Sequence, residues 1–334
     1  GCKTLWNERY KMSGVRILEN EPGRRLKVFA PGKVNLLLRV GERPPNQPRH
    51  ELLTVFQGLD LGEYLTVRPR ISGKMDVVQT VLAPGLTGPK NLDRPGNLAL
   101  KAIQALRVNG AKVPPTSIKV EKNIPVAGGM AGGSADAAGV LYAANALYQL
   151  GFTLAELQSL GAKLGADVPF GLTGGNALGL GFGDKMLSLP GGTKCYWVLA
   201  VFPRGLSTPK VFGAFDRLIP DPQPLPATLS PDFVAALDGD VAELAGYLHN
   251  DLQAAALDIF PELSHVIAAA EQAGALKAVV SGSGPTIAAL CPDAPSQENV
   301  AARLGAHPLV ARVFSAAGPA RGDTTDSESA SFNQ

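Results

Sequence analysis

The stretch of small residues from Pro125 to Ser134 is the part of this sequence with the clearest chemical meaning. It holds four glycines within the six positions 128–133 and runs directly into a segment of helical composition. Residues without bulky side chains let successive backbone N–H groups turn toward one concavity. The first turn of the following helix adds unpaired N–H groups and the positive end of its dipole. These features indicate a loop that binds nucleotide phosphates, whereas the alternative is a tight turn before a well-capped helix.

This glycine-rich loop differs from the commoner nucleotide-binding motifs. The G-x-x-x-x-G-K-S/T pattern requires a lysine after the glycines, and this sequence has none there. No G-x-G-x-x-G follows a first strand with an acid about 20 residues later, as in dinucleotide-binding folds. The glycines of residues 179–183 resemble a protein-kinase loop, but no V-A-I-K or H-R-D element accompanies them. We therefore interpret residues 179–183 as a turn.

The composition limits the class of protein. At roughly 150 residues per domain, the 334 residues suggest two lobes, and 45% hydrophobic residues can supply a sizeable core. A net charge of +2 offers no electrostatic footprint for nucleic acid or an anionic membrane. Apolar runs such as Tyr196–Phe202 are far shorter than a membrane span. The three cysteines (Cys2, Cys195 and Cys291) lack metal-ligand spacing and are typical of a reducing, cytoplasmic compartment.

Hydrophobic periodicity and punctuating glycines and prolines predict the elements of the fold. The expected strands are Leu26–Ala30, Val34–Val40, Glu51–Leu59, Glu63–Pro69, Ser117–Val120, Tyr196–Phe202 and Ala278–Ser281. The expected helices are Asn97–Asn109, Ala135–Leu150, Thr153–Leu164, Pro231–Leu237, Asp240–Leu248 and Phe260–Ala273. Thr153 and Glu156 form a capping-box pattern. Because strands come first and helices cluster later, the pattern favours an α+β fold.

The two ends have little apolar material, and the chain divides on this basis. We expect residues 1–25 to be a flexible or foreign extension and residues 318–334 to be a disordered tail. Between them we expect an N-terminal lobe at residues 26–190, which holds the glycine-rich loop, and a C-terminal lobe at residues 191–317.

Three ordered motifs together carry a family resemblance. They are Ala30-Pro31-Gly32-Lys33-Val34-Asn35-Leu36, the glycine-rich loop, and Val280-Ser281-Gly282-Ser283-Gly284-Pro285-Thr286. The sequence thereby resembles the GHMP-type small-molecule kinases, which include galactokinase, homoserine kinase and mevalonate kinase. Within this superfamily it looks most like the 4-diphosphocytidyl-2-C-methyl-D-erythritol kinases of non-mevalonate isoprenoid biosynthesis. The further matching segments are His50-Glu51-Leu52, Gly165–Phe170, Thr208-Pro209 with Phe212, and Asn250-Asp251-Leu252.

The resemblance implies both a fold and an activity. The fold has an N-terminal α+β lobe and a C-terminal ferredoxin-like α/β sandwich, with the active site in the cleft between them. The activity is ATP-dependent phosphorylation of the 2-hydroxyl of 4-diphosphocytidyl-2-C-methyl-D-erythritol. One alternative is a related kinase for homoserine, mevalonate or a sugar, and another is a non-catalytic nucleotide-binding regulator. The implied partner is a small molecule, neither nucleic acid nor membrane, and the choice between monomer and homodimer stays open.

The resemblance assigns Lys33 and Asp167 to the catalytic centre. Phosphoryl transfer needs charge neutralisation and alignment more than covalent chemistry. If the fold brings the two side chains together, Lys33 holds Asp167 ionised and Asp167 accepts the proton of the attacking hydroxyl. Taken singly, a lysine or an aspartate is more often a solvated surface charge.

For ATP, the resemblance implies that the loop wraps the phosphates and that Asn97, Leu98 and Lys122 surround the adenine. An ordinary helix N-cap is the alternative role for Asn97. Mg²⁺ is required to shield the transferred phosphoryl group, and Ser134 is the best candidate for its protein ligand. The predicted ATP-binding set is Asn97, Leu98, Lys122, Pro125, Val126, Ala127, Gly128, Gly129, Met130, Ala131, Gly132, Gly133, Ser134 and Ala135.

For the cytidine-linked substrate, the resemblance implies that the His50 ring hydrogen-bonds the cytosine edge and that Phe212 stacks on its face. The family pattern Asp-Gly-Tyr-His is here Gln47-Pro48-Arg49-His50, so a guanidinium replaces a stacking tyrosine. A guanidinium can also lie flat on a base. The third motif either contacts the ligand or forms a plain strand–turn corner. The predicted substrate-binding set is Asn35, Arg49, His50, Asp167, Thr208, Pro209 and Phe212.

Overall fold

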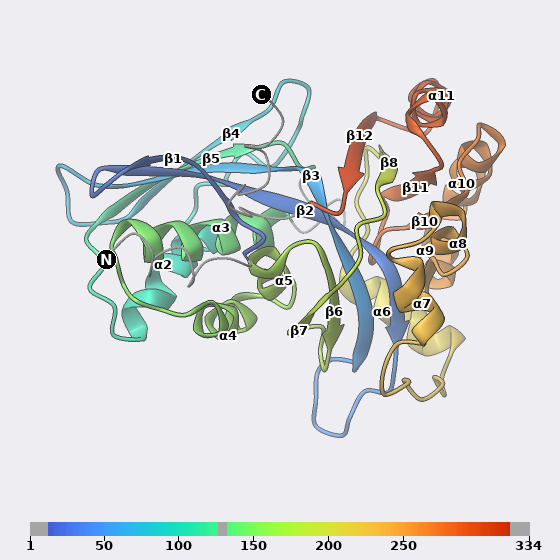
Figure 1. Cartoon of the computed structure of the whole chain (residues 1–334), viewed down its shortest axis with the longest axis horizontal. Helices are drawn as coiled ribbons and strands as arrows, with labels where there is room; N and C mark the ends of the chain where they lie inside the picture. The colour runs from blue at the N-terminus through green and yellow to red at the C-terminus, as the bar shows by residue number, and fades with distance from the viewer. Residues whose placement is uncertain (1–12, 126–131, 321–334) are drawn as a thin grey trace, which may run out of the picture.

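Two β-sheets organise the protein into two lobes. The computed structural model describes residues 13–125 and 132–320 of the chain (Figure 1). In this part of the chain the larger sheet has eight strands and the smaller has four. The larger sheet comprises β1 (Arg16–Glu21), β2 (Arg25–Val40), β3 (Leu52–Pro69), β4 (Val77–Leu82), β5 (Thr116–Lys122), β6 (Asn176–Leu180), β7 (Lys185–Leu189) and β9 (His249–Asn250).

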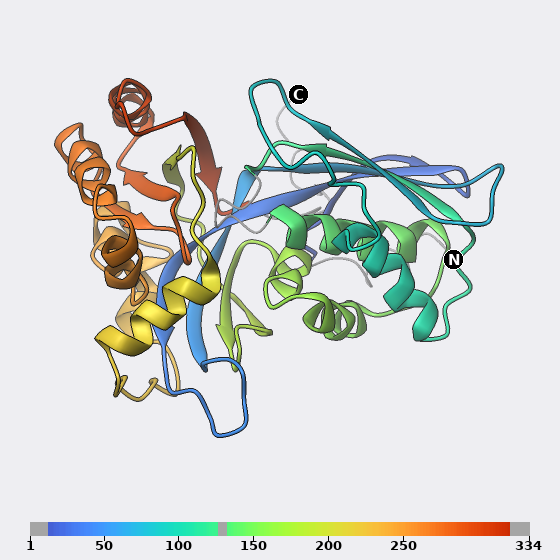
Figure 2. The same cartoon turned by 180° about the vertical axis from the view of Figure 1, so that it is seen from behind.

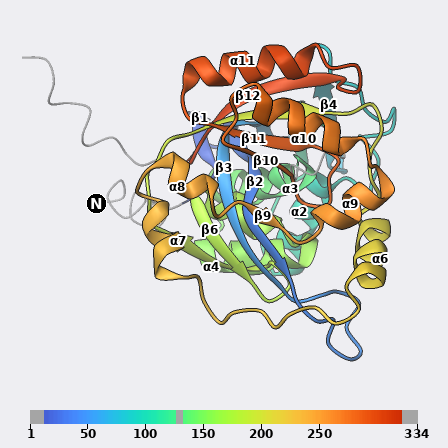
Figure 3. The same ribbon diagram turned by 90° about the vertical axis from the view of Figure 1, so that its right-hand side faces the viewer.

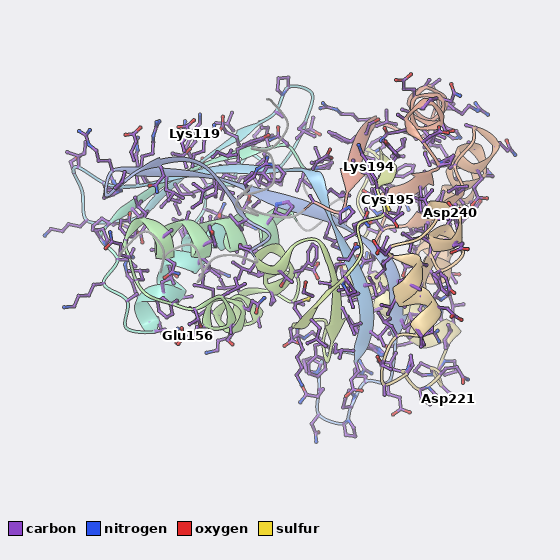
Figure 4. All side chains as sticks on the ribbon, viewed as in Figure 1. Lys119, Glu156, Lys194, Cys195, Asp221 and Asp240 are labelled. Carbon is purple, nitrogen blue, oxygen red and sulfur yellow. The ribbon has the colours of Figure 1, made fainter. Side chains whose placement is uncertain are left out.

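In the N-terminal lobe, helices cover one face of the larger sheet, and the other face carries exposed side chains. The covering helices are α2 (Leu98–Val108), α3 (Gly132–Leu147), α4 (Leu154–Leu164) and α5 (Val168–Thr173). The alternation of β5 fits this arrangement, because Ile118 and Val120 are buried whereas Lys119 is exposed. Figure 4 shows Lys119 on the open face of the sheet and Glu156 on α4, on the opposite side of the lobe.

The strands β2 and β3 are longer than the sequence predicts. The two strands predicted on either side of Pro31 are the single strand β2, and the two predicted on either side of Gly62 are the single strand β3. The expected break at Pro31 is a register shift against β3, where Pro31 lies opposite Gly62. One half of β3 pairs with β5 and the other half with β6. The two long strands therefore extend from the N-terminal lobe into the space between the lobes.

The C-terminal lobe has the expected ferredoxin-like topology. Its strands β8 (Cys195–Val201), β10 (Lys277–Val280), β11 (Ile287–Cys291) and β12 (Arg312–Gly318) are all antiparallel, in the order β10-β11-β8-β12. Helices α10 (Leu263–Gln272) and α11 (Ala294–Gly305) lie over this sheet (Figure 3). The remaining helices are α6 (Thr208–Leu218), α7 (Pro231–Ala236), α8 (Val241–Ala245) and α9 (Gln253–Ile259). The predicted α+β class is confirmed.

Both predicted ends are partly structured. Strand β1 pairs with β2, and Val15 is fully buried, so ordered structure begins well before residue 26. At the other end, the backbone N–H of Ala320 donates to Gly58, and the carbonyl of Ala320 accepts from Gly175. Backbone pairing that the sequence pattern does not reveal therefore orders residues 13–25 and 318–320. Within the described ranges, every helix is too short or too polar to cross a membrane.

A buried hydrogen-bonded pair joins the two lobes. The Trp197 indole N–H of β8 donates to Oε1 of Gln57 on β3 at 2.8 Å, and both residues are fully buried. The amide of Gln57 in turn donates to Asn176 on β6. Figure 4 marks Lys194 and Cys195 where β8 begins, between the larger sheet and the C-terminal helices. Gln57 and Trp197 therefore form a polar anchor between the lobes inside a continuous core.

We expect Trp197→Phe to lower the free energy of unfolding by about 1–3 kcal/mol, because it leaves a buried amide oxygen without its donor. Tyr196→Phe, one position earlier on β8, keeps the ring that Lys194 covers and should change stability by less than about 0.5 kcal/mol. Urea denaturation of both variants measures the difference. Equal stabilities for the two variants would contradict the anchoring role of Trp197.

Candidate active site

A cavity of about 900 Å³ lies between the lobes. Strands β2 and β3, the first turn of α3, the corner before α5, helix α6 and the third motif all contribute to its wall. Seen from behind, α6 crosses the long strands β2 and β3 (Figure 2), and its apolar face packs on them through Val211 and Phe215. The cavity wall includes Lys33, Asn35, Arg49, His50, Leu98, Pro125, Gly132, Gly133, Ser134, Asp167, Thr208, Pro209 and Phe212.

Lys33 brings a nearly buried ammonium to the cavity wall. The residue is 5% exposed, and Nζ donates to Oδ1 of Asn35 at 2.7 Å. Oδ2 of Asp167 lies 3.8 Å from the same nitrogen, and the ring of Phe56 lies below it. Burial lowers the pKa of Lys33, and the charge of Asp167 partly opposes this shift. The structure thus brings together the lysine and aspartate that the motifs single out.

A short hydrogen-bonded chain fixes the amide of Asn35. Its Nδ2 donates to the hydroxyl of Thr54 on β3 at 2.8 Å, and that hydroxyl donates to the carbonyl of Leu37. The amide oxygen of Asn35 must therefore face Lys33 rather than turn away. Thr54 and Phe56 complete this corner of the cavity, although no sequence motif pointed to either residue.

Asp167 occupies the N-cap position of α5 without capping it. Its backbone is helical, and its side chain makes no cap hydrogen bond. The side chain is 34% exposed and lines the cavity beside Ala166. Because Pro169 stands in the first turn of α5, one backbone donor that a cap would have to satisfy is absent. The carboxylate is consequently available to a ligand.

Helix α3 presents its N-terminal end to the cavity. Gly132, Gly133 and Ser134 line the wall, whereas every residue from Ala135 to Leu147 is buried. A helix surrounded by protein keeps its dipole field poorly screened at the open end. Val126–Ala131 lie outside the described residues, so their predicted phosphate contacts stay predictions. Pro125, which precedes them, lines the cavity.

Lys122 lies beneath the start of α3 rather than on the cavity wall. Its ammonium contacts Asp136 at 2.7 Å and Glu63 at 3.2 Å, and all three side chains are nearly buried. Burial is the largest cause that raises the pKa of Glu63 to about 7 and that of Asp136 to about 6, and the Lys122 charge opposes both shifts. Sequence reasoning missed Glu63. The triad lies under the first turn of α3. The adenine contact of Lys122 stays a prediction.

Asn97 caps α2 with its amide oxygen, and its amide nitrogen binds the loop before the helix. Oδ1 accepts from the N–H of Ala99, and Nδ2 donates to the carbonyl of Leu92, each at 2.8 Å. Asn97 therefore has the ordinary helix N-cap role that was the alternative to an adenine contact. Leu98, the next residue, does line the cavity.

The other end of the cavity has an aromatic wall. The His50 ring stacks beside Phe212 with centroids 5.6 Å apart, and its Nδ1 donates to the carbonyl of Gly41 at 2.8 Å. The guanidinium of Arg49 lies 5.3 Å from the ring centroid of Phe182. Phe182 sits in the turn predicted for residues 179–183, where Gly181 and Gly183 have positive φ. Sequence reasoning missed the cavity role of Phe182 and of Asp216, which also lines this end.

The third motif forms the rim of the cavity opposite β2. Gly282, Ser283 and Gly284 line the wall, and the Ser283 hydroxyl shares a 2.9 Å hydrogen bond with that of Thr208. Asn250 donates to the carbonyls of Val280 and Gly282, which holds the turn in place. The segment Asn250-Asp251-Leu252 therefore supports the rim, as only Leu252 reaches the cavity.

Known proteins are similar to this chain over most of its length. Sequence models described as GHMP kinases N terminal domain and GHMP kinases C terminal match residues 97–177 and 232–308. The 4-diphosphocytidyl-2-C-methyl-D-erythritol kinase of Mycolicibacterium smegmatis is 45% identical over 88% of this chain and 90% of its own length. That of Streptomyces coelicolor is 45% identical over 89% of this chain and 98% of its own. The chain belongs to the 4-diphosphocytidyl-2-C-methyl-D-erythritol kinase family.

Solved structures agree with this membership of the 4-diphosphocytidyl-2-C-methyl-D-erythritol kinase family. A crystal structure of 4-(cytidine 5'-diphospho)-2C-methyl-D-erythritol kinase superposes with a TM-score of 0.68 at 31% identity, covering 87% of this chain and 98% of the other. Homoserine kinase from Cytophaga hutchinsonii gives 0.65 at 16% identity, covering 91% and 97%. The second likeness shows the shared fold alone. The family resemblance drawn from three motifs is confirmed, and the family is one of ATP-dependent kinases.

The Glu63–Lys122–Asp136 triad has a consequence for stability against pH. Glu63 ionises near its ordinary pKa of 4.5 in the unfolded chain but only near 7 in the folded one. The unfolded state therefore loses its proton first, and the free energy of unfolding falls as the pH rises through this window. Between pH 4.5 and 7.5 we expect the Glu63→Gln variant to lose less free energy of unfolding than the wild type, by on the order of 2–3 kcal/mol. The reason is that the variant has no carboxyl group at position 63 to ionise.

Urea denaturation between pH 4.5 and 7.5 measures this effect. Glu121→Gln is the control, because Glu121 pairs with Lys27 and Lys119 at a half-buried site on the sheet surface. A Glu63→Gln slope equal to that of the wild type would mean that the carboxyl group ionises normally in the folded protein.

Proposed function

We propose that this protein transfers the γ-phosphoryl group of ATP to the 2-hydroxyl of 4-diphosphocytidyl-2-C-methyl-D-erythritol. One observation carries the proposal: a single cavity joins the N-terminal end of helix α3, a lysine–aspartate pair and an aromatic wall. The three features match the triphosphate, the reacting hydroxyl and the cytosine in that order. Family membership at 45% identity supports the same substrate.

The phosphates of ATP would lie at the N-terminal end of α3. The N–H groups of Gly132 and Gly133 and the helix dipole attract their charge. The ammonium of Lys33, 3.8 Å from the Asp167 carboxylate, then stabilises the charge of the transferred group. Asp167 accepts the proton of the 2-hydroxyl as the oxygen attacks phosphorus, and ADP leaves with the electrons of the broken P–O bond.

The cavity suits a magnesium ion that arrives with ATP. Mg²⁺ typically takes one or two carboxylates, substrate phosphates and several waters rather than a protein cage. Within residues 13–125 and 132–320, no cluster of three His, Cys, Asp or Glu could hold a metal. The hydroxyl of Ser134 lines the cavity, and its oxygen could complete such a shell. When bound, the ion neutralises the charge of the β- and γ-phosphates.

The cytidine would occupy the aromatic wall. Phe212 offers a ring face, and the Arg49 guanidinium stands where the family pattern has a tyrosine. Arg43 and Arg49 also line the cavity, and their positive charge would attract the substrate diphosphate. The two buried free cysteines, Cys195 and Cys291, fit a reducing compartment, so we place this reaction in the cytoplasm.

The role of Asp167 leads to a kinetic prediction. We expect Asp167→Asn to lower kcat by roughly 100- to 10,000-fold, because an amide cannot accept the hydroxyl proton. The KM for ATP should change little, as the phosphates bind at α3. Asp221→Asn, in an exposed loop after α6 (Figure 4), serves as the control. Full turnover by Asp167→Asn in a steady-state assay would rule out its role as proton acceptor.

The substrate assignment has its own test. ATP consumption should be rapid with 4-diphosphocytidyl-methylerythritol and slower by roughly 100-fold or more with the same acceptor lacking cytidine, since binding energy at the base positions the hydroxyl. Homoserine and mevalonate should support no turnover. Turnover of either small alcohol at the rate of the nucleotide-linked substrate would favour the alternative kinase.

A further inference from the structure

Two carboxylates line the cavity within the described residues, Asp167 and Asp216. The proposed reaction gives Asp216 no role. Asp216 lies in the last two turns of α6, whose cavity side is one continuous stripe. The stripe consists of Thr208, Pro209, Phe212, Gly213 and Asp216. The opposite side of α6, with Val211, Ala214 and Phe215, is buried in the core, so packing fixes which way the stripe faces.

The carboxylate of Asp216 lies beside the edge of the His50 ring. Oδ1 is 2.8 Å from Nε2 of His50, and that nitrogen is buried without a well-aligned hydrogen bond. The ring itself is 8% exposed and cannot turn freely, because Nδ1 donates to the Gly41 carbonyl. Asp216 is more open, with 39% of its side chain exposed. A buried ring edge and an accessible carboxylate thus stand side by side at the cavity.

Phe212 relates this pair to a bound base. Phe212 and Asp216 are four residues apart on α6, so they are neighbours on one helix face about one turn apart. A pyrimidine that stacks on Phe212 has its edge within reach of Asp216 and His50. Cytosine presents an amino donor on this edge, whereas uracil presents a carbonyl acceptor at the same place. A carboxylate accepts hydrogen bonds and donates none, and it is a favourable partner for the cytosine amino group.

We propose that Asp216 accepts a hydrogen bond from the exocyclic amino group of cytosine and thereby makes the protein specific for cytidine-linked over uridine-linked substrates. This inference rests on the proposed function, because it needs a pyrimidine at the aromatic wall. With a uridine substrate, the carbonyl oxygen would face the carboxylate, and both acceptors would lose solvent without gaining a donor. Sites built around a required hydrogen bond reject the mismatched analogue strongly for this reason.

The test compares kcat/KM for 4-diphosphocytidyl-methylerythritol and for its uridine counterpart. We expect the wild type to prefer the cytidine substrate by roughly 100-fold or more. Asp216→Asn should reduce this preference by roughly tenfold or more, because its amide can accept from cytosine or donate to uracil. The loss should appear in KM for the cytidine substrate, with kcat retained. Asp216→Ala should reduce the preference as well, and thermal melting confirms that both variants fold.

Asp258→Asn is the matched control. Asp258 is 42% exposed and pairs with Arg217 of α6, yet it lies outside the cavity wall. It should keep the wild-type preference. The inference is overturned if Asp216→Asn keeps the wild-type preference for the cytidine substrate, or if its kcat/KM falls equally for both substrates. In either case, turnover of the cytidine substrate leaves the proposed function standing. Absence of turnover by the wild type with either nucleotide-linked substrate overturns both.

Discussion

A lysine ammonium withdrawn from water at the centre of the cleft sets the main constraint on this structure. Burying such an ion costs several kcal/mol unless nearby groups stabilise its charge. Asn35, Asp167 and the ring of Phe56 surround the Lys33 ammonium, and they come from β2, the corner before α5, and β3. The long bent strands and the α5 corner must therefore keep their relative positions. The same surroundings leave the ammonium poorly hydrated, so in the proposed reaction it would act strongly on the transferred phosphoryl group.

The packing of α3 supplies the second half of the cleft. Its N-terminal end can face the phosphates only if the rest of the helix lies inside the lobe. Small residues permit this, since a Cβ at Gly139 would lie 2.7 Å from Leu65 and 3.3 Å from Ala30 on the sheet. Beneath the first turn, Lys122 balances Glu63 and Asp136. Burial raises the pKa of both carboxyl groups, and this reduces the negative charge that would oppose a triphosphate.

Local signals in the sequence predicted what depends on local chemistry. The caps of α2 and α4, at Asn97 and Thr153, follow from side chains that bond their own backbone. Lys33 and Asp167 were singled out because their motifs resemble those of the kinase family. The continuity of β2 and β3 was missed, since it depends on strand partners far along the chain. Glu63 and Asp216 were missed for a similar reason: each gains its meaning only from a neighbour brought close by folding, Lys122 or His50.

The central claim is that one cleft aligns ATP and the 2-hydroxyl at the Lys33–Asp167 pair. A crystal structure with a non-hydrolysable ATP analogue and 4-diphosphocytidyl-methylerythritol tests it most directly. We expect the terminal phosphate between the α3 N-terminus and Lys33, with the 2-hydroxyl about 2.6–3.2 Å from the Asp167 carboxylate. A terminal phosphate bound away from α3, or a 2-hydroxyl beyond the reach of Asp167 even through one water, would contradict it.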